Sequence, residues 1–311
     1  MNNSTLIKDK LLSLINEMDQ YHWLFTRNPE IDFTRVKKWS FSDVIRFIIT
    51  MEGNSLKDEL YDYFDFSCNT PTNSSFNQRR SQVLPEAFEF LFHEFTSSVS
   101  YEKLYHGYRL LACDGSDLCI AHDPDDKTTY FQSTPLSRGF NQLHLNAVYD
   151  LQTRTYTDAI IQPACQENEN RAMCDMIDRY SGHLKTIFIA DRGYENYNIF
   201  AHAQEHGVFY LIRAKDLLSN GIVSSVREQL PKNQMTFDRS VSITLTRKQT
   251  NAVKANPKKY RIIMKATAFD YLDLHVKKFY DLQMRIVRFP ISENTYESII
   301  TNLPTEDFSL E

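Results

Sequence analysis

The segment at residues 186–194 constrains the fold of this chain more than any other stretch. It begins with a run of mostly β-branched or aromatic residues without polar alternation, TIFIA at 186–190. Such a run is typical of a strand that is buried on both faces of a sheet. The strand ends at Asp191, and a helix is expected from Asn196 to about His206, closed by Gly207. The segment therefore predicts an α/β fold with a carboxylate at the carboxyl end of a central strand. Binding and active sites of open α/β sheets usually lie at these strand ends.

A second apolar run, residues 110–113, also ends in an acid, Asp114, followed by Gly115. Two strands of one sheet that each end in Asp can bring their carboxylates together. Unpaired carboxylates repel one another, and their desolvation is costly. A divalent cation removes that cost, and Mg²⁺ prefers such oxygen ligands. Asp114 and Asp191 therefore predict a metal site suited to attack on phosphate, although Asp191 alone could be a helix-capping loop residue.

Several short motifs, taken together and in order, resemble the DDE transposases of bacterial insertion sequences, in the insertion sequence 4 group. They are LACDGS at 111–116, IADRGY at 189–194 and FYLIR at 209–213, with weaker matches at 145–150, at 168–172 and at 298–304. The resemblance extends over most of the chain after the first helices. It implies a ribonuclease-H-like catalytic domain, two Mg²⁺ ions for which Mn²⁺ can substitute, and three catalytic carboxylates. Asp114 and Asp191 match the first two as catalytic residues and metal ligands.

The third carboxylate of the family has no match in this sequence. In the family it is a Glu on a helix with a Tyr, Arg, Glu, Lys series, shortly after the strand that residues 298–304 resemble. Residues 305–311 contain neither Tyr nor Arg, and Glu311 comes too early to correspond to the catalytic Glu. We therefore expect a chain that is truncated before the third carboxylate, binds metal less well and is defective alone.

The resemblance implies a transposase that cleaves DNA strands at transposon ends and joins them to target DNA. Its partners would be double-stranded DNA and a second copy of the chain or an intact transposase. Two alternatives remain open: a non-catalytic DNA-binding remnant that inhibits transposition, and a metal-dependent nuclease that uses another carboxylate, for instance from another subunit. Arg192 could contact DNA phosphate beside Asp191, or it could pair with a nearby acid.

The pattern of the sequence predicts four segments. Residues 1–100 are expected to form a helical DNA-binding domain, and residues 101–213 the first part of the ribonuclease-H-like domain. Residues 214–283 alternate in short runs and predict a β-rich insertion with antiparallel strands at 241–245, 261–264 and 272–276. Residues 284–311 return to the catalytic domain and leave it incomplete. A mixed sheet with an N-terminal helical domain and a β-rich insertion is the expected fold class.

Residues 70–80 predict the DNA contact of the helical segment. A polar, Pro-containing entry precedes a short helix that would present Gln78, Arg79 and Arg80, as in a helix-turn-helix contact. The alternative is a solvated basic turn. Ser40 is expected to cap the preceding helix, which starts at Phe41.

Two further acids lie near the predicted site in sequence. Residues 117–122 predict a strand that forms a hairpin with residues 110–113. If the first strand continues instead, Asp117 is expected on the same strand face as Asp114, where it could bind metal. Glu169 follows Asn168, a predicted N-cap, and we expect Glu169 to interact with the helix dipole rather than with metal.

The composition argues mildly against a DNA-binding protein, because 35 Lys and Arg face 40 Asp and Glu. Any DNA contact must therefore come from local basic patches. No stretch is long and apolar enough for a membrane span, and the first residues are too polar for a secretory signal. The five cysteines form no CxxC pair, which fits the reducing cytoplasm of a bacterium. Phosphate-binding glycine loops and HExxH zinc motifs are absent from the sequence.

Overall fold

In a computed structural model, the chain divides into two compact units, residues 1–100 and 101–311. The structure describes residues 3–35, 38–98, 103–232, 234–273, 275–293 and 295–310. Each unit has its own hydrophobic core. In the described ranges, the helices are all too short or too polar to cross a membrane. Glu311, on which part of the expected truncation depends, lies outside the described residues.

Unit 1 is helical and packs around aromatic side chains. Its elements are α1 (Asn3–Gln20), η1 (His22–Phe25), α2 (Phe41–Thr50), α3 (Leu56–Tyr63), α4 (Asn73–Arg80) and α5 (Glu86–Ser97). As predicted, Ser40 caps α2, because its Oγ accepts the N–H of Asp43 at 3.0 Å. The Phe47 ring centroid lies 5.4 Å from that of Trp39 and 4.7 Å from that of Phe76. These rings supply a large share of the apolar area that stabilises a unit of this size.

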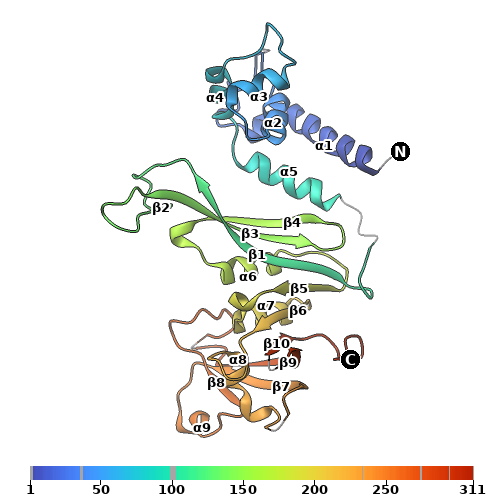
Figure 1. The fold of residues 1–311 in the computed structure, drawn as a ribbon, viewed down its shortest axis with the longest axis vertical. Coiled ribbons are helices and arrows are strands. Elements are labelled where there is room, and N and C mark those ends of the chain that lie inside the picture. Colours follow the sequence, from blue (N-terminus) through green and yellow to red (C-terminus); the bar gives the residue numbers. More distant parts are fainter. Residues whose placement is uncertain are drawn as a thin grey trace. The chain divides into compact units, whose positions relative to one another are not determined.

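Unit 2 is built on one mixed sheet (Figure 1). Among the described residues this sheet has ten strands in the order β2-β3-β1-β5-β6-β10-β9-β7-β8, with β4 paired to β3. The strands are β1 (Arg109–Ile120), β2 (Tyr130–Phe131), β3 (Phe140–Asp150), β4 (Thr155–Pro163), β5 (Thr186–Ala190), β6 (Phe209–Ala214), β7 (Phe237–Thr246), β8 (Tyr260–Ile262), β9 (Phe279–Ser292) and β10 (Thr295–Thr301). The helices are η2 (Ala164–Gln166), α6 (Glu169–Asp178), η3 (Arg192–Tyr194), α7 (Tyr197–Glu205), α8 (Ile222–Ser225), η4 (Arg227–Gln229) and α9 (Asn251–Lys254).

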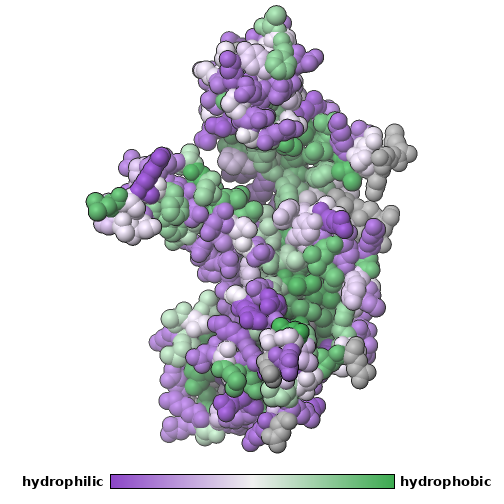
Figure 2. Space-filling model, in the orientation of Figure 1, coloured by the Kyte–Doolittle hydropathy of each residue, from purple (hydrophilic) through white to green (hydrophobic). Residues whose placement is uncertain are grey.

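Strands β4, β3, β1, β5 and β6 form a ribonuclease-H-like core, as predicted. β3 is antiparallel to its neighbours β4 and β1, whereas β1, β5 and β6 are parallel. α6 and α7 bury one face of this core, which includes Cys113, Phe188 and Tyr210. The other face carries half-buried residues such as Ile189, packed around Leu303. Both faces of β5 are therefore covered, which explains its unbroken apolar sequence. Apolar side chains also reach the surface of unit 2 near the start of β1 (Figure 2).

The course of β1 corrects two expectations, the hairpin at its start and the face on which Asp117 lies. The predicted hairpin between residues 110–113 and 117–122 is wrong, because β1 continues unbroken from Arg109 to Ile120. The Asp114-Gly115 pair does not turn, since its residues keep their ladder partners Ala147 and Asn146 on β3. Asp117 then lies three residues beyond Asp114 on a regular strand. Side chains alternate between faces with a period of two, so Asp117 and Asp114 point to opposite faces of the sheet.

The β-rich residues after β6 extend the same sheet rather than starting another. β10 pairs antiparallel with β6, and β9 and β7 follow in antiparallel order. β8, however, runs parallel to β7, against the antiparallel expectation, because the connection through α9 returns the chain in the same direction. The strand expected at 272–276 is also wrong for the described residues. Asp273 Oδ1 accepts the N–H groups of His275 and Val276 at 2.6 and 2.9 Å and forms a turn instead.

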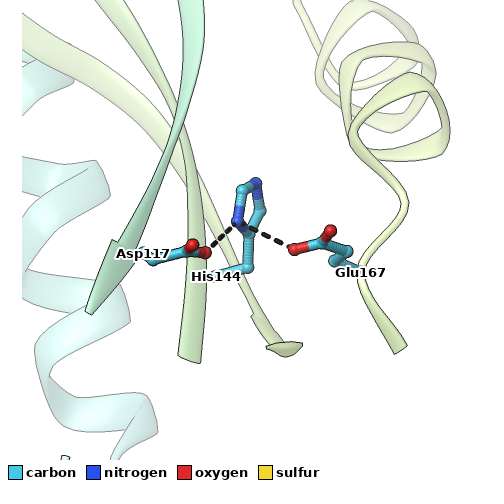
Figure 3. Close-up of side chains that lie close together, drawn as sticks. All are labelled: Asp117, His144 and Glu167. Atoms are coloured by element: carbon cyan, nitrogen blue, oxygen red, sulfur yellow. Dashed lines mark hydrogen bonds and ion pairs between the residues drawn. The ribbon is translucent and has the colours of Figure 1, made fainter. Parts of the chain in front are cut away.

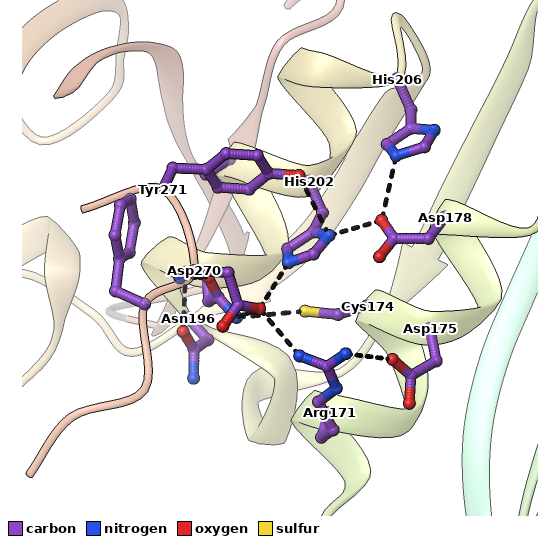
Figure 4. A network of polar contacts seen from close by, with 12 residues as sticks. Arg171, Cys174, Asp175, Asp178, Asn196, His202, His206, Asp270 and Tyr271 are labelled. Atoms are coloured by element: carbon purple, nitrogen blue, oxygen red, sulfur yellow. Dashed lines mark hydrogen bonds and ion pairs between the residues drawn. The ribbon is translucent and has the colours of Figure 1, made fainter. Parts of the chain in front are cut away.

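A buried histidine ties α6 and α7 to the loop before β9 (Figure 4). His202 on α7 places Nδ1 2.5 Å from Asp178 Oδ1 on α6, and Nε2 2.9 Å from Asp270 Oδ2 in the loop. Asp270 also accepts from Arg171 Nη1 at 2.9 Å and from Asn198 Nδ2 at 3.0 Å. Burial raises the pKa of Asp270, but its bonds to Asn198 and His202 and the charge of Arg171 outweigh burial and lower it. The network fixes α6 and α7, the two helices that bury one face of the sheet.

Candidate active site

Asp114 and Asp191 each come two residues after a paired residue of the adjacent parallel strands β1 and β5. Ala112 on β1 pairs with Ile189 on β5. Asp114 lies two residues further along β1, and Asp191 directly follows the end of β5 with an extended backbone at φ −82° and ψ −179°. Both follow the alternation of the face that carries Ile189, opposite to the face covered by α6 and α7. Both are exposed, so the register delivers two accessible carboxylates to one face of the sheet.

Two arginines and a buried glutamate adjoin Asp191 on the same face. Arg213 on β6 places Nη1 3.1 Å from Asp191 Oδ1, and its Nη2 donates to Glu297 Oε2 at 3.0 Å. Arg192 Nη2 donates to the other carboxylate oxygen of Glu297 at 2.9 Å. Burial raises the pKa of Glu297, but the two guanidinium groups outweigh burial and lower it. Glu297 on β10 is thus a charged carboxylate held by two arginines, each of which keeps about half of its side chain exposed.

Glu169 on α6 brings another carboxylate to β1, on the face of the sheet opposite to Asp114. A Cβ placed on Gly115 would lie 2.3 Å from Oε1 of Glu169, and one on Gly193 would lie 3.7 Å from Oε2 of Glu169. Each of these glycines follows closely after one of the two aspartates in the chain. Glu169 is the first residue of α6, with Asn168 as its N-cap, as predicted, so the helix dipole also favours its charge. Glu169 therefore occupies space that a side chain at position 115 would fill.

A cluster of His144 and acids lies on the α6 face of β1 and β3 (Figure 3). His144 Nδ1 is 2.8 Å from Asp117 Oδ1 and 3.2 Å from Glu167 Oε2, and its Nε2 is 3.2 Å from Glu169 Oε1. Burial lowers the pKa of His144, but the bond to Asp117 and the charges of Glu167 and Glu169 outweigh burial and raise it. Asp117 is therefore drawn into this cluster rather than toward Asp114.

The sulfur and phenol groups near the site are not candidates for nucleophiles. Cys113 lies directly before Asp114 but is buried, and burial raises the pKa of its thiol to about 12. Burial also raises the pKa of Tyr194 well above its usual range. Both groups stay neutral near pH 7, which leaves the carboxylates and arginines as the candidate functional groups around Asp114 and Asp191.

In unit 1, the three predicted DNA contacts on α4 differ in accessibility. Gln78 and Arg80 are exposed, with the Arg80 guanidinium 5.8 Å from the Phe76 ring centroid. Arg79 is 9% exposed; its guanidinium lies 5.0 Å from the Phe33 ring, and Nη1 donates to Gln82 Oε1 at 2.9 Å. The helix thus presents Gln78 and Arg80 to solvent, whereas the side chain of Arg79 points into the interior of unit 1.

The sequence did not predict roles for Arg213, Glu297, His144 and Glu167. The motif FYLIR contains Arg213, but nothing in the pattern shows that β6 pairs beside β5. His144 and Asp117 are opposite one another because of the register of β1 and β3, which no local motif sets. Glu169 is different, because its position directly after the predicted N-cap Asn168 indicated from the sequence that it lies at the start of a helix.

Comparison with known protein families agrees with this geometry. A sequence model of the family described as Transposase DDE domain matches residues 105–310, which is most of unit 2. No curated protein matches the chain.

Proposed function

Because the chain belongs to the DDE transposase family, whose members use divalent metal ions, we propose that it is an insertion-sequence transposase of the insertion sequence 4 group. The reaction is phosphoryl transfer on double-stranded DNA: strand cleavage at transposon ends, then strand transfer to a target. The observation that supports this most is that Asp114 and Asp191 each come two residues after the paired residues Ala112 of β1 and Ile189 of β5.

We propose that Asp114 and Asp191 hold Mg²⁺, for which Mn²⁺ can substitute. The residues fit such an ion, because both are accessible oxygen donors, Asp114 on β1 and Asp191 directly after β5. When bound, the metal supplies Lewis-acid stabilisation of phosphate oxygens and activation of the attacking water or 3′-hydroxyl. Arg213, at 3.1 Å from Asp191, occupies the position of a counter-charge and would release the carboxylate as a cation binds.

The protein's own cations position the DNA in this proposal. Arg192 and Arg213 keep 47% and 48% of their side chains exposed while Glu297 fixes their orientation. Guanidinium groups held in this way can bind phosphate by two parallel hydrogen bonds. In unit 1 we assign Gln78 and Arg80 to DNA contact and Arg79 to packing. The domain division at residues 100, 213 and 283, and association of two copies around two DNA ends, remain part of the proposal.

A nicking assay tests the proposal. Supercoiled plasmid carrying the DNA on both sides of the gene is incubated with the purified chain and Mg²⁺ or Mn²⁺. We expect nicks that vanish with chelator and fall by on the order of 10³-fold in Asp114→Asn and Asp191→Asn. Asp125→Asn, an exposed acid on a loop of unit 2, is the matched control and should nick normally.

The same assay separates the competing readings. Tight binding of end-bearing DNA without nicking would replace the enzyme with the DNA-binding inhibitor. Nicking that survives both Asp114→Asn and Asp191→Asn would place the active site elsewhere in the chain.

A further inference from the structure

We propose that Asp117, His144 and Glu167 bind one transition-metal dication of the Zn²⁺ class, at a site separate from Asp114 and Asp191. The proposal goes beyond transposase chemistry and does not depend on it. Its basis is the arrangement of three ligand atoms: Asp117 Oδ1, His144 Nδ1 and Glu167 Oε2 all lie within 4.8 Å of one another (Figure 3).

The spacing of these atoms suits a single ion. Zn²⁺ binds imidazole nitrogen and carboxylate oxygen at roughly 2.0–2.2 Å, so ligands in a tetrahedron lie roughly 3.3–3.6 Å apart. The imidazole nitrogen already lies 2.8 Å from Asp117 Oδ1 and 3.2 Å from Glu167 Oε2. Small side-chain rotations are therefore sufficient to place all three atoms around one cation.

The backbone holds the ligands on firm elements. Asp117 on β1 and His144 on β3 are direct cross-strand partners, and side chains at such positions share one face of the sheet. Glu167 comes directly before Asn168, which caps α6 through its bond to the Arg171 N–H at 3.0 Å. A metal here would join the β1–β3 ladder to the start of α6.

The charge of the cluster favours a dication. Three carboxylates, Asp117, Glu167 and Glu169, surround one imidazole ring, so the group stays negative even with an imidazolium. Like charges in one site repel, and a bound dication removes the repulsion. The side chains of Asp117 and Glu167 are 52% and 50% exposed, which leaves space for a water ligand and a path for the ion.

The second ring nitrogen of His144 points to the same conclusion. His144 is 6% exposed, and its Nε2 is buried without a hydrogen-bond partner of good geometry. Glu169 Oε1 lies 3.2 Å from Nε2, so a small rotation would make the bond. In metal sites the ligating histidine usually donates its other N–H to a carboxylate, which fixes the ring orientation. Glu169 is placed for that role.

The ligand types select the metal class. Imidazole suits Zn²⁺ and neighbouring transition metals, whereas Mg²⁺ prefers oxygen ligands and octahedral geometry. One nitrogen and two carboxylate oxygens on half-exposed side chains match a zinc site with an open position. The exposed thiols Cys68, Cys119 and Cys165 could also bind Zn²⁺, so they must be removed in the test.

Zn²⁺ titration by calorimetry, with Co²⁺ absorption as the spectroscopic probe, tests the site. The full chain carrying Cys68→Ser, Cys119→Ser and Cys165→Ser is first freed of metal with a chelator. We expect one Zn²⁺ per chain in addition to any ion at Asp114 and Asp191, a rise in Tm on binding, and visible Co²⁺ bands. In Asp117→Asn, Glu167→Gln and His144→Gln, Zn²⁺ affinity should fall at least tenfold and the bands should weaken or disappear.

The controls make the result decisive. His275→Gln removes an exposed histidine elsewhere in unit 2, and the double variant Asp114→Asn with Asp191→Asn removes the proposed Mg²⁺ ligands; both should keep the site. Glu167→Gln changes a half-exposed side chain, so it reports on the site even if His144→Gln does not fold. Zn²⁺ binding that is absent, that is unchanged in Glu167→Gln and Asp117→Asn, or that is lost only in the double variant would overturn the proposal. Loss of DNA nicking would have no bearing on it.

Discussion

Arg213 contacts Asp191 across two parallel strands, with Nη1 of the arginine 3.1 Å from Oδ1 of the aspartate. The same guanidinium donates to Glu297 at 3.0 Å, so one residue links an exposed carboxylate to a nearly buried one. This link places a permanent positive charge beside the proposed metal ligand. The ionisation of Glu297 on β10 also depends on this arginine of β6.

Substitution of Arg213 should therefore change the pKa of Glu297. In Arg213→Gln, only Arg192 remains to offset the burial of Glu297, so the pKa of Glu297 should rise. A depressed acid pKa contributes stability above the unfolded pKa, and this contribution is lost as pH falls through the folded pKa. We expect Arg213→Gln to lower the urea midpoint at pH 7 and to lower it less near pH 3. NMR titration of Glu297 measures the shift, with exposed Lys215→Gln as control; an unchanged pKa would contradict the link.

The two glycines beside the aspartates form a matched pair. A Cβ on Gly115 would meet Glu169 Oε1 at 2.3 Å and the buried His144 ring at 2.6 Å, whereas one on Gly193 would meet Glu169 at 3.7 Å. Gly115→Ala should therefore displace Glu169 and His144 and lower the free energy of unfolding by about 1–3 kcal/mol. Gly193→Ala should change it by less than about 1 kcal/mol. Chemical denaturation measures both, and equal effects would refute the packing described around Glu169.

Neighbouring arginines on α4 should separate DNA binding from stability. Arg80 is exposed and Arg79 is buried against Phe33. Arg80→Ala should weaken DNA binding uniformly across sequences and reduce the slope of log affinity against log salt by about one. Arg79→Ala should instead destabilise unit 1 by about 1–2 kcal/mol, because it loses packing and a hydrogen bond. Salt-dependent anisotropy and thermal unfolding provide the two readouts; a normal salt slope in Arg80→Ala would remove α4 from the DNA interface.

Asp216 should govern part of the acid sensitivity of unit 2. Hydrogen bonds from Arg288 outweigh burial and hold the pKa of Asp216 at about 2. An unfolded Asp has a pKa of about 3.9, so the pair contributes on the order of 2 kcal/mol above that pH. The contribution is lost as pH falls from about 3.9 through the folded pKa. Asp216→Asn should be less stable than the wild type at pH 7, with the difference shrinking below pH 4. A difference that stays constant with pH would exclude this role.

The central strands and their acids could be predicted from the sequence because the signals are local. Continuous apolar runs mark β1 and β5, and the acids directly after those runs mark the two carboxylates of the candidate site. The caps Ser40 and Asn168 were likewise readable from residue types that favour the N-cap position. These features depend on neighbours within a few positions.

Features set by long-range register could not be predicted. The Asp-Gly of β1 looked like a turn, but ladder partners on β3 carry the strand through it. That continuation moved Asp117 to the opposite face and beside His144. Arg213 and Glu297 lie 84 positions apart and meet only because β10 pairs with β6. The parallel pairing of β8 with β7 depends on the connection through α9, which no local motif predicts.

Anomalous diffraction from crystals grown with Mn²⁺ tests the central claim most directly. The account predicts a manganese peak in contact with Asp114 and Asp191, with Arg213 withdrawn from its 3.1 Å contact with Asp191. The peak should disappear in crystals of the Asp191→Asn variant grown in the same way. Saturating Mn²⁺ that leaves Asp114 and Asp191 without a peak, and Arg213 still paired with Asp191, would contradict the account.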